Sequence, residues 1–248
     1  MARRALRGHA DEDNFLASSA DLMACVLFVF ILLALVFAIK ARDAQAVANE
    51  KSRELDEAKV KWGDTTAARM GLLEDLQKGL SQKGIVVYIN QDKDGLLFPE
   101  GVLRFDQCSN ELRSSDRANL GTLAEELGPA VRRFSLLCGA SDSSTVPDQQ
   151  IDVVLVEGHT DRRAPAPGCG YRDNWDLSTA RASATRDLLL EANAELGGFC
   201  NAQSRPLFAI AGYADQRPAS TSATDDDNRR IELRFIMRPP AIEGAYGR

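Results

Sequence analysis

The chain has 248 residues and a formal net charge of −6, and 44% of its residues are hydrophobic. This length suits one membrane span, a linker and one domain of ordinary size, and a single apolar stretch excludes a multi-span transporter. The acidic balance, without a basic patch that contains interleaved aromatic residues, argues against direct binding of nucleic acid.

The apolar stretch follows a charged N-terminal tail at 1–20. Leu22–Ile39 contains no charged residue, proline or glycine. As a helix that rises about 1.5 Å per residue it is roughly 27 Å long, enough to cross the hydrocarbon core of a bilayer. We therefore predict a transmembrane helix at 21–40. A cleaved signal peptide is a weaker interpretation, because the apolar run is long and Lys40 and Arg42 follow it instead of a small-residue cleavage site.

Asp21 lies at the head of this span, one helical turn after Ser18. A carboxylate at the edge of a membrane helix is costly, and such residues commonly move ions or pair with a partner protein. The stretch alone leaves two interpretations open. Asp21 either carries an ion, or it caps the helix or faces water at the interface.

The next segment, 41–84, is rich in Ala, Glu, Lys, Arg and Leu and contains no proline, so it predicts a helical linker. Leu73, Leu76 and Leu80 form an apolar stripe on this helix. Gly63–Asp64 is a candidate break. We expect the helix to pack loosely against a copy of itself, because a lone exposed helix with little apolar surface is marginally stable. The alternative is a solvated spacer.

The segment 85–238 predicts a compact α+β domain, with a C-terminal tail at 239–248. Apolar residues at helical spacing predict helices that begin at Ser114 or the next residue and at about Trp175. Gly128–Pro129 is a candidate kink or break in the first. Because the last two strands have no long helix between them, we expect a mixed sheet with helices packed on one face. β-branched and aromatic runs predict strands at 85–89, 96–98, 151–156, 208–210 and 231–237.

Two connections in this domain carry polar residues. Asn90–Gly95 has the spacing of the first half of a calcium loop, but the closing glutamate is missing from its place. We therefore favour a plain hairpin turn over a metal site. The segment 139–150 is rich in Ser, Asp and Pro and predicts a loop.

Polar motifs stand where the predicted strands end or begin. They offer a carboxylate, amides, hydroxyls and guanidinium groups, and Gly158 lets the chain turn sharply after the strand at 151–156. The candidate site residues are Thr160, Asp161, Asn174, Leu177, Ser178, Arg181, Asn228 and Arg229.

The order of these motifs, GHTD, NxxLSxxRA, GYAD and NRRIEL, resembles the signature of the OmpA-like peptidoglycan-binding domain over residues 85–238. The resemblance implies that a diaminopimelate residue of the cell-wall peptide lies in a groove, with its carboxylate on Arg181 and its ammonium on Asp161. One anion and one planar cation suit a zwitterionic head. The alternative is that Asp161 and Arg181 pair only with each other. The loop between Asp161 and Asn174 departs from the family, because it is rich in Pro and Gly and contains Cys169.

The chain has five cysteines, of which Cys25 lies in the predicted span. On the predicted topology Cys108 and Cys169 each lie after a strand, and Cys138 and Cys200 each lie after a helix at the opposite end. Because a disulfide needs Cα atoms within about 7 Å, we predict the pairs Cys108–Cys169 and Cys138–Cys200. The alternative is four free thiols. Charge alone leaves the orientation open, but paired cysteines favour a cytoplasmic N-terminus and a periplasmic domain across the inner membrane.

A single span headed by Ala20-Asp21-Leu22-Met23, a helical linker and an OmpA-like domain together resemble the B subunit of ion-driven stators of the MotB type. The resemblance implies that Asp21 carries a proton, and that a multi-span MotA-like or ZorA-like subunit forms a ring around a homodimer of this chain. The tail, span and cysteines look most like the ZorB family of the Zorya anti-phage defence system. A flagellar stator and a passive anchor between membrane and cell wall are the alternatives. We expect no enzyme activity, metal or cofactor, because the two histidines show neither triad nor metal spacing.

Overall fold

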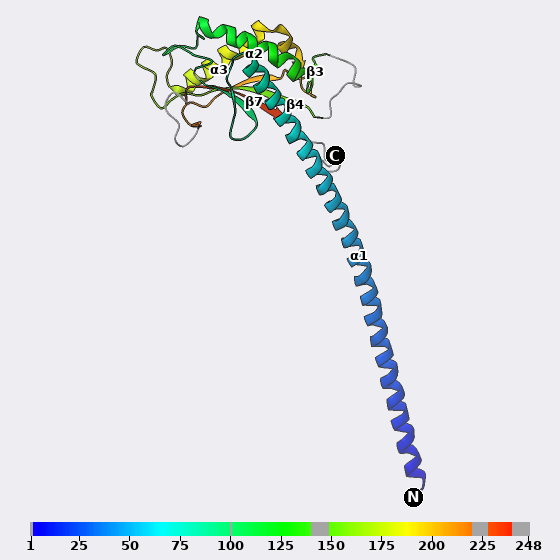
Figure 1. Cartoon of the computed structure of the whole chain (residues 1–248). Helices are drawn as coiled ribbons and strands as arrows, with labels where there is room; N and C mark the ends of the chain where they lie inside the picture. The colour runs from blue at the N-terminus through cyan, green and yellow to red at the C-terminus, as the bar shows by residue number, and fades with distance from the viewer. Residues whose placement is uncertain (1, 100, 140–148, 220–227, 240–248) are drawn as a thin grey trace. The chain divides into compact units, whose positions relative to one another are not determined.

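The computed structural model describes residues 2–99, 101–139, 149–219 and 228–239, and the side chains of Ser19 and of residues from Asp21 onward within these ranges. The chain divides into two units, one that extends to Lys59 and a second that begins at Val60. The first element is the long helix α1 (Ala2–Gln82), drawn from blue to cyan in Figure 1.

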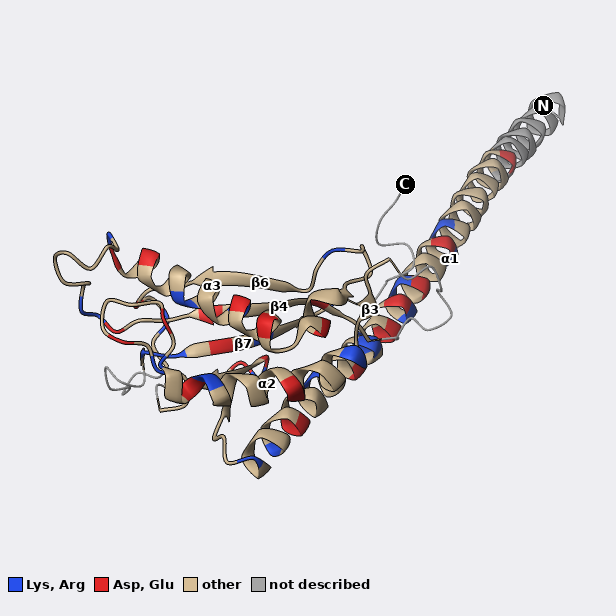
Figure 2. Cartoon of the chain, turned by 90° about the horizontal axis from the view of Figure 1, so that it is seen from above, with Lys and Arg blue, Asp and Glu red and all other residues tan. Residues whose placement is uncertain are grey.

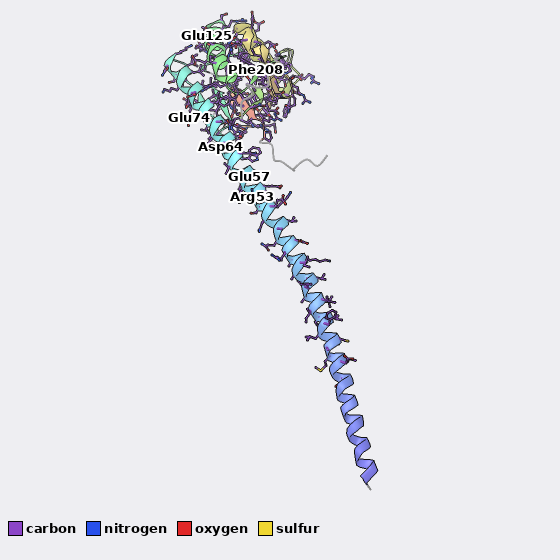
Figure 3. All side chains as sticks on the ribbon, turned by 90° about the vertical axis from the view of Figure 1, so that its right-hand side faces the viewer. Arg53, Glu57, Asp64, Glu74, Glu125 and Phe208 are labelled. Atoms are coloured by element: carbon purple, nitrogen blue, oxygen red, sulfur yellow. A yellow bond between two sulfur atoms is a disulfide. The ribbon has the colours of Figure 1, made fainter. Side chains whose placement is uncertain are left out.

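In the first unit, α1 contains the predicted transmembrane segment. Among the described residues, one helix, α1, is long and apolar enough to cross a membrane by its length and composition, over the part from Asp21 onward. The large apolar side chains between Leu22 and Ile39 are exposed on the isolated chain. Further along, Arg53 and Glu57 form an ion pair of 3.9 Å at helical spacing (Figure 3).

The candidate break at Gly63–Asp64 is wrong, because α1 continues through both residues. A glycine in a helix interior costs only about 1 kcal/mol, and good helix formers surround this one. No atom lies within 4 Å of the place where a Cβ would stand on Gly63. The position therefore faces open space, and nothing there forces the backbone out of the helix.

The last turns of α1 belong to the core of the second unit. Leu72, Leu73, Leu76 and Leu80 are each at most 2% exposed and lie in the same hydrophobic cluster as the sheet and the other helices. The apolar stripe predicted for the linker is thus covered by this chain's own domain, which leaves it unavailable for packing against a copy. The second unit accordingly begins inside the predicted linker, 41–84.

The domain is built on a five-stranded mixed sheet in the order β1-β2-β7-β4-β6. β4 and β6 run parallel, and the other neighbours run antiparallel. The helices α2 (Ser114–Arg132) and α3 (Asn174–Ala192) lie on one side of this sheet (Figure 1), and in Figure 2 α3 crosses β4 while α2 lies beside β7. The strands are β1 (Tyr88–Ile89), β2 (Gly95–Phe98), β4 (Ile151–Gly158), β6 (Phe208–Gly212) and β7 (Ile231–Met237). The predicted α+β fold is therefore confirmed.

Local details differ from the sequence-based expectation. The first strand is only two residues long, and α2 is not split, because the helix continues through Pro129. Buried Leu127 and Val131 flank Pro129 and hold the helix on the core, which outweighs the one backbone hydrogen bond that proline removes. A small sheet of β3 (Leu136–Leu137) and β5 (Phe199–Cys200) was not predicted. The short helix η2 (Ala194–Gly198) precedes β5.

The turn between β1 and β2 is a plain hairpin, as the sequence predicts. The Asn90 side-chain oxygen accepts hydrogen bonds from the backbone nitrogens of Asp94 and Gly95, so this oxygen closes the turn itself. Of the loop predicted at 139–150, residues 140–148 lie outside the described residues.

Candidate functional site

A cavity of about 290 Å³ lies beside the end of β4, the start of α3 and the segment that precedes α2. It is lined by the predicted site residues Thr160, Asp161, Asn174, Leu177, Arg181 and Arg229. The two other predicted residues, Ser178 and Asn228, are buried but do not line it. The polar motifs thus converge on one groove, although they come from distant parts of the chain.

Two glycines let α3 approach the sheet at this end. A Cβ on Gly158 would collide with the Ser178 carbonyl, and a Cβ on Gly212 would collide with Thr179. The Ser178 hydroxyl accepts a hydrogen bond of 3.1 Å from the Ala214 nitrogen, which ties α3 to the turn after β6. Ser178 therefore helps to position the site and does not face a ligand.

Asn228 also has a structural contact. Its side-chain oxygen accepts a hydrogen bond of 3.0 Å from the Ala219 nitrogen. By contrast, the Asn174 side-chain nitrogen donates to the Asp161 carbonyl at 3.0 Å, which fixes the strand end against the start of α3. The Thr160 hydroxyl is buried and has no hydrogen-bond partner among the described residues.

Asp161 is the acidic residue of the groove, and two arginines hold it. Arg163 donates to it from its backbone nitrogen at 2.9 Å and from its guanidinium at 3.1 and 2.5 Å, and Arg229 donates at 2.7 Å. Burial alone would raise the pKa of Asp161, but these hydrogen bonds outweigh it and the pKa lies below its usual value. The carboxylate is therefore ionised throughout the neutral range.

Arg181 is buried in the wall of the groove. Its guanidinium donates to the carbonyls of Ser109 at 3.0 Å and Asp106 at 3.2 Å, and it lies 5.2 Å from the ring centroid of Phe105. The alternative in which Asp161 and Arg181 pair only with each other is wrong, because each has other partners. Arg181 thus holds the segment before α2 against α3, with its positive charge at the cavity.

The groove is more basic than the sequence predicts. Arg113 and Arg163 also line it, which brings four guanidinium groups to a cavity whose only carboxylate among the described lining residues is Asp161. Arg113 pairs with Asp106 at 2.8 Å. The run Asp-Arg-Arg at 161–163 offered a signal for Arg163, whereas nothing in the sequence places Arg113 near the strand end.

The structure joins Cys108 to Cys169 and Cys138 to Cys200, the pairing that the sequence predicts. The first disulfide connects the wall of the cavity that contains Cys108 to the Pro- and Gly-rich loop that contains Cys169. The second lies in the small sheet, away from the groove. Cys25 is free.

A second buried polar cluster lies beside the groove, and no pattern in the sequence predicts it. The ligand atoms of Glu157, His159 and Glu232 lie within 4.8 Å of one another, a spacing that could hold a metal ion. However, Arg234 contacts Glu157 at 3.1 Å and Arg230 contacts Glu232 at 2.6 Å. Because these guanidinium groups already balance the two carboxylates, the cluster suits an internal ion network better than a divalent cation.

The histidine of this cluster gives the domain a predicted pH dependence. Burial lowers the pKa of His159 from 6.5, with Glu157 and Glu232 raising it and Arg230 lowering it, and the net direction is down. The unfolded chain then binds a proton at His159 that the folded chain does not bind. The contribution of His159 to the free energy of unfolding is therefore fully present above pH 6.5 and is lost as the pH drops below this value. We expect the free energy of unfolding to decrease as the pH falls from 7 through 6.5, and to decrease less steeply in His159→Gln. Urea unfolding at several pH values measures both, and an equal slope in the variant would contradict this assignment.

Together, a mixed sheet with helices on one face and a polar groove at a strand end define a class of α+β domain, and comparison with known proteins identifies the family. The model of the OmpA family matches residues 104–232, so the chain belongs to the OmpA family. None of the curated proteins matches the chain.

Three solved structures are similar to this chain, and the first of them, with a TM-score above 0.5, shares its fold. A putative MotB-like protein from Desulfovibrio vulgaris is 19% identical over 70% of this chain and 93% of that one, with a TM-score of 0.51. The cell wall anchor of the T6SS from Pseudomonas aeruginosa is 23% identical over 67% and 97% of the two chains, with a TM-score of 0.44. The periplasmic domain of Helicobacter pylori MotB is 15% identical over 60% and 81%, with a TM-score of 0.43.

Proposed function

We propose that the domain binds peptidoglycan through the groove beside β4 and α3. The observation that carries the proposal is the buried guanidinium of Arg181 at a cavity that the family's motif residues line together. A planar guanidinium matches a carboxylate in two parallel hydrogen bonds, and diaminopimelate in the cell-wall peptide offers such carboxylates. The cavity, at about 290 Å³, suits one amino-acid head group rather than a sugar chain.

Replacement of Arg181 tests this proposal. We expect Arg181→Ala to weaken binding to purified cell-wall sacculi by about 10- to 100-fold, because a hydrogen bond to a charged group contributes about 1.5–3 kcal/mol. Co-sedimentation of the full chain in detergent measures the affinity. Arg172→Ala is the matched control, because Arg172 forms an exposed ion pair with Asp176 and does not line the cavity.

Because Arg181 also supports the segment before α2, the thermal unfolding of the variant must be compared with that of wild type. Arg181→Lys adds a second comparison, since lysine keeps the charge and loses the planar fork. Unchanged sedimentation of a folded Arg181→Ala protein would refute the role of the groove.

The whole chain fits a stator subunit. We propose that α1 crosses the inner membrane at 21–40 with the N-terminus in the cytoplasm, that Asp21 carries a proton, and that the periplasmic domain fixes the chain to the cell wall. Two copies would lie within a ring of a multi-span MotA-like or ZorA-like subunit. The apolar side chains of α1 support the proposed membrane crossing, because they are exposed on the isolated chain and a bilayer or partner helices must cover them.

Among stators we place the Zorya anti-phage defence complex first and the flagellar motor second. A passive anchor between membrane and wall is the candidate from a different class, because its span and wall-binding domain would be the same. Purification from native membranes separates a stator from a passive anchor. A multi-span protein that co-purifies in excess over this chain supports a stator, and its absence supports an anchor.

A further inference from the structure

The Oδ2 atom of Asp161 is already saturated by groups of its own chain. This oxygen accepts three hydrogen bonds, two from the Arg163 guanidinium and one from Arg229, and the Oδ1 atom accepts the Arg163 backbone nitrogen. A carboxylate oxygen offers about two lone-pair directions. An ammonium that approached Oδ2 would therefore have to displace a guanidinium, and Arg163 supplies two of the three donors there.

The charge around the groove opposes that displacement. Arg113, Arg163, Arg181 and Arg229 line the cavity together with Asp161. When Asp106, the partner of Arg113, is counted as well, four arginines face two carboxylates. A ligand ammonium would add another positive charge to this groove, whereas ligand carboxylates would reduce the excess.

Arg163 is well placed to hold its position. It is two residues from Asp161, so the pair closes a short local turn, and the backbone nitrogen of the same residue is one of the donors. The Asp161 side chain is only 8% exposed, which strengthens these hydrogen bonds relative to those of a surface pair.

We propose that Arg163 occupies the place of a ligand ammonium on Asp161, so that the groove selects diaminopimelate by its carboxylates and accepts residues whose side-chain amine is acylated. A peptide cross-link through that amine creates such an acylated form. The inference rests on the proposed peptidoglycan binding and specifies which form of the peptide this groove takes.

Three synthetic cell-wall peptides that differ only at diaminopimelate test the proposal. One has a free side-chain amine, one has this amine acetylated, and one has the side-chain carboxylate amidated. With the full wild-type chain in detergent, we expect calorimetry to give dissociation constants within about threefold for the first two and at least about tenfold weaker binding for the third, which is the loss of one charge-assisted hydrogen bond.

Arg163→Ala should restore dependence on the amine. Because Asp161 then loses its main partner, we expect the free-amine peptide to bind at least about tenfold more tightly than the acetylated one. Arg163 has a side chain that is 66% exposed, so the variant should fold, and thermal unfolding checks this. Arg172→Ala, an exposed arginine in the same loop that pairs with Asp176, should behave as wild type.

Two results overturn the inference alone. One is a tenfold loss of wild-type affinity on acetylation, and the other is an Arg163→Ala variant that binds both amine forms equally. If wild type binds neither sacculi nor any of the three peptides, the proposed function fails and the inference fails with it.

Discussion

Asp21→Asn is expected to abolish proton movement through the complex while the chain still enters the membrane and binds the cell wall. Asparagine has nearly the same shape as aspartate but cannot bind and release a proton. If Asp21 is the carrier, conduction should fall to background, because ionisable side chains in a membrane span are the groups that relay protons. Proton influx into vesicles that contain this chain and its ring partner measures the effect.

The control for this experiment is Asp43→Asn. Asp43 lies on α1 after the apolar stretch, so the variant loses one acidic group without changing the head of the span. We expect its conduction to equal that of wild type. If Asp21→Asn conducts as wild type does, or if wild type itself does not conduct, the chain is an anchor and the stator proposal is wrong.

Removal of either disulfide is expected to cost about 4 kcal/mol of the free energy of unfolding, because each one closes a loop of about 60 residues in the unfolded chain. The paired cysteines are separated by 61 and 62 residues, so the two losses should be nearly equal. Double replacement by serine at Cys108 and Cys169, or at Cys138 and Cys200, followed by denaturant unfolding, measures them.

The two double variants differ in their expected effect on binding. Only the Cys108–Cys169 disulfide joins two segments that line or border the cavity, so only its removal should also weaken binding to sacculi. The variant without the Cys138–Cys200 disulfide is the control, because it should lose nearly the same free energy of unfolding. Equal sacculus binding by the two variants at a temperature where both are folded would show that this disulfide does not shape the groove.

The features that could be predicted depend on local patterns. β-branched runs placed the long strands, and the alternation of strands and helices gave the mixed sheet with its helices on one side. That topology was sufficient to pair Cys138 with Cys200, since each was expected after a helix and before a strand, at the same end of the sheet. The family motifs likewise placed Asp161 and Arg181 at one groove.

The features that were missed depend on contacts between distant segments. The stripe of Leu73, Leu76 and Leu80 has the same pattern whether it packs on a copy or on its own domain, and only the fold decides between them. Arg113 reaches the groove because the segment before α2 folds over it, which no local pattern indicates. His159 lies in a motif that was recognised, but its burial between Glu157 and Glu232 follows from the pairing of β4 with β7.

The insertion of the last turns of α1 into the core has a mechanical consequence. Tension applied to this helix would act directly on the domain core, because Leu72, Leu76 and Leu80 are packed among the side chains of the sheet and the other helices. A pull would therefore have to shear a close-packed interior, and such interiors resist deformation strongly. The domain is thus suited to resist a sustained force as one solid body.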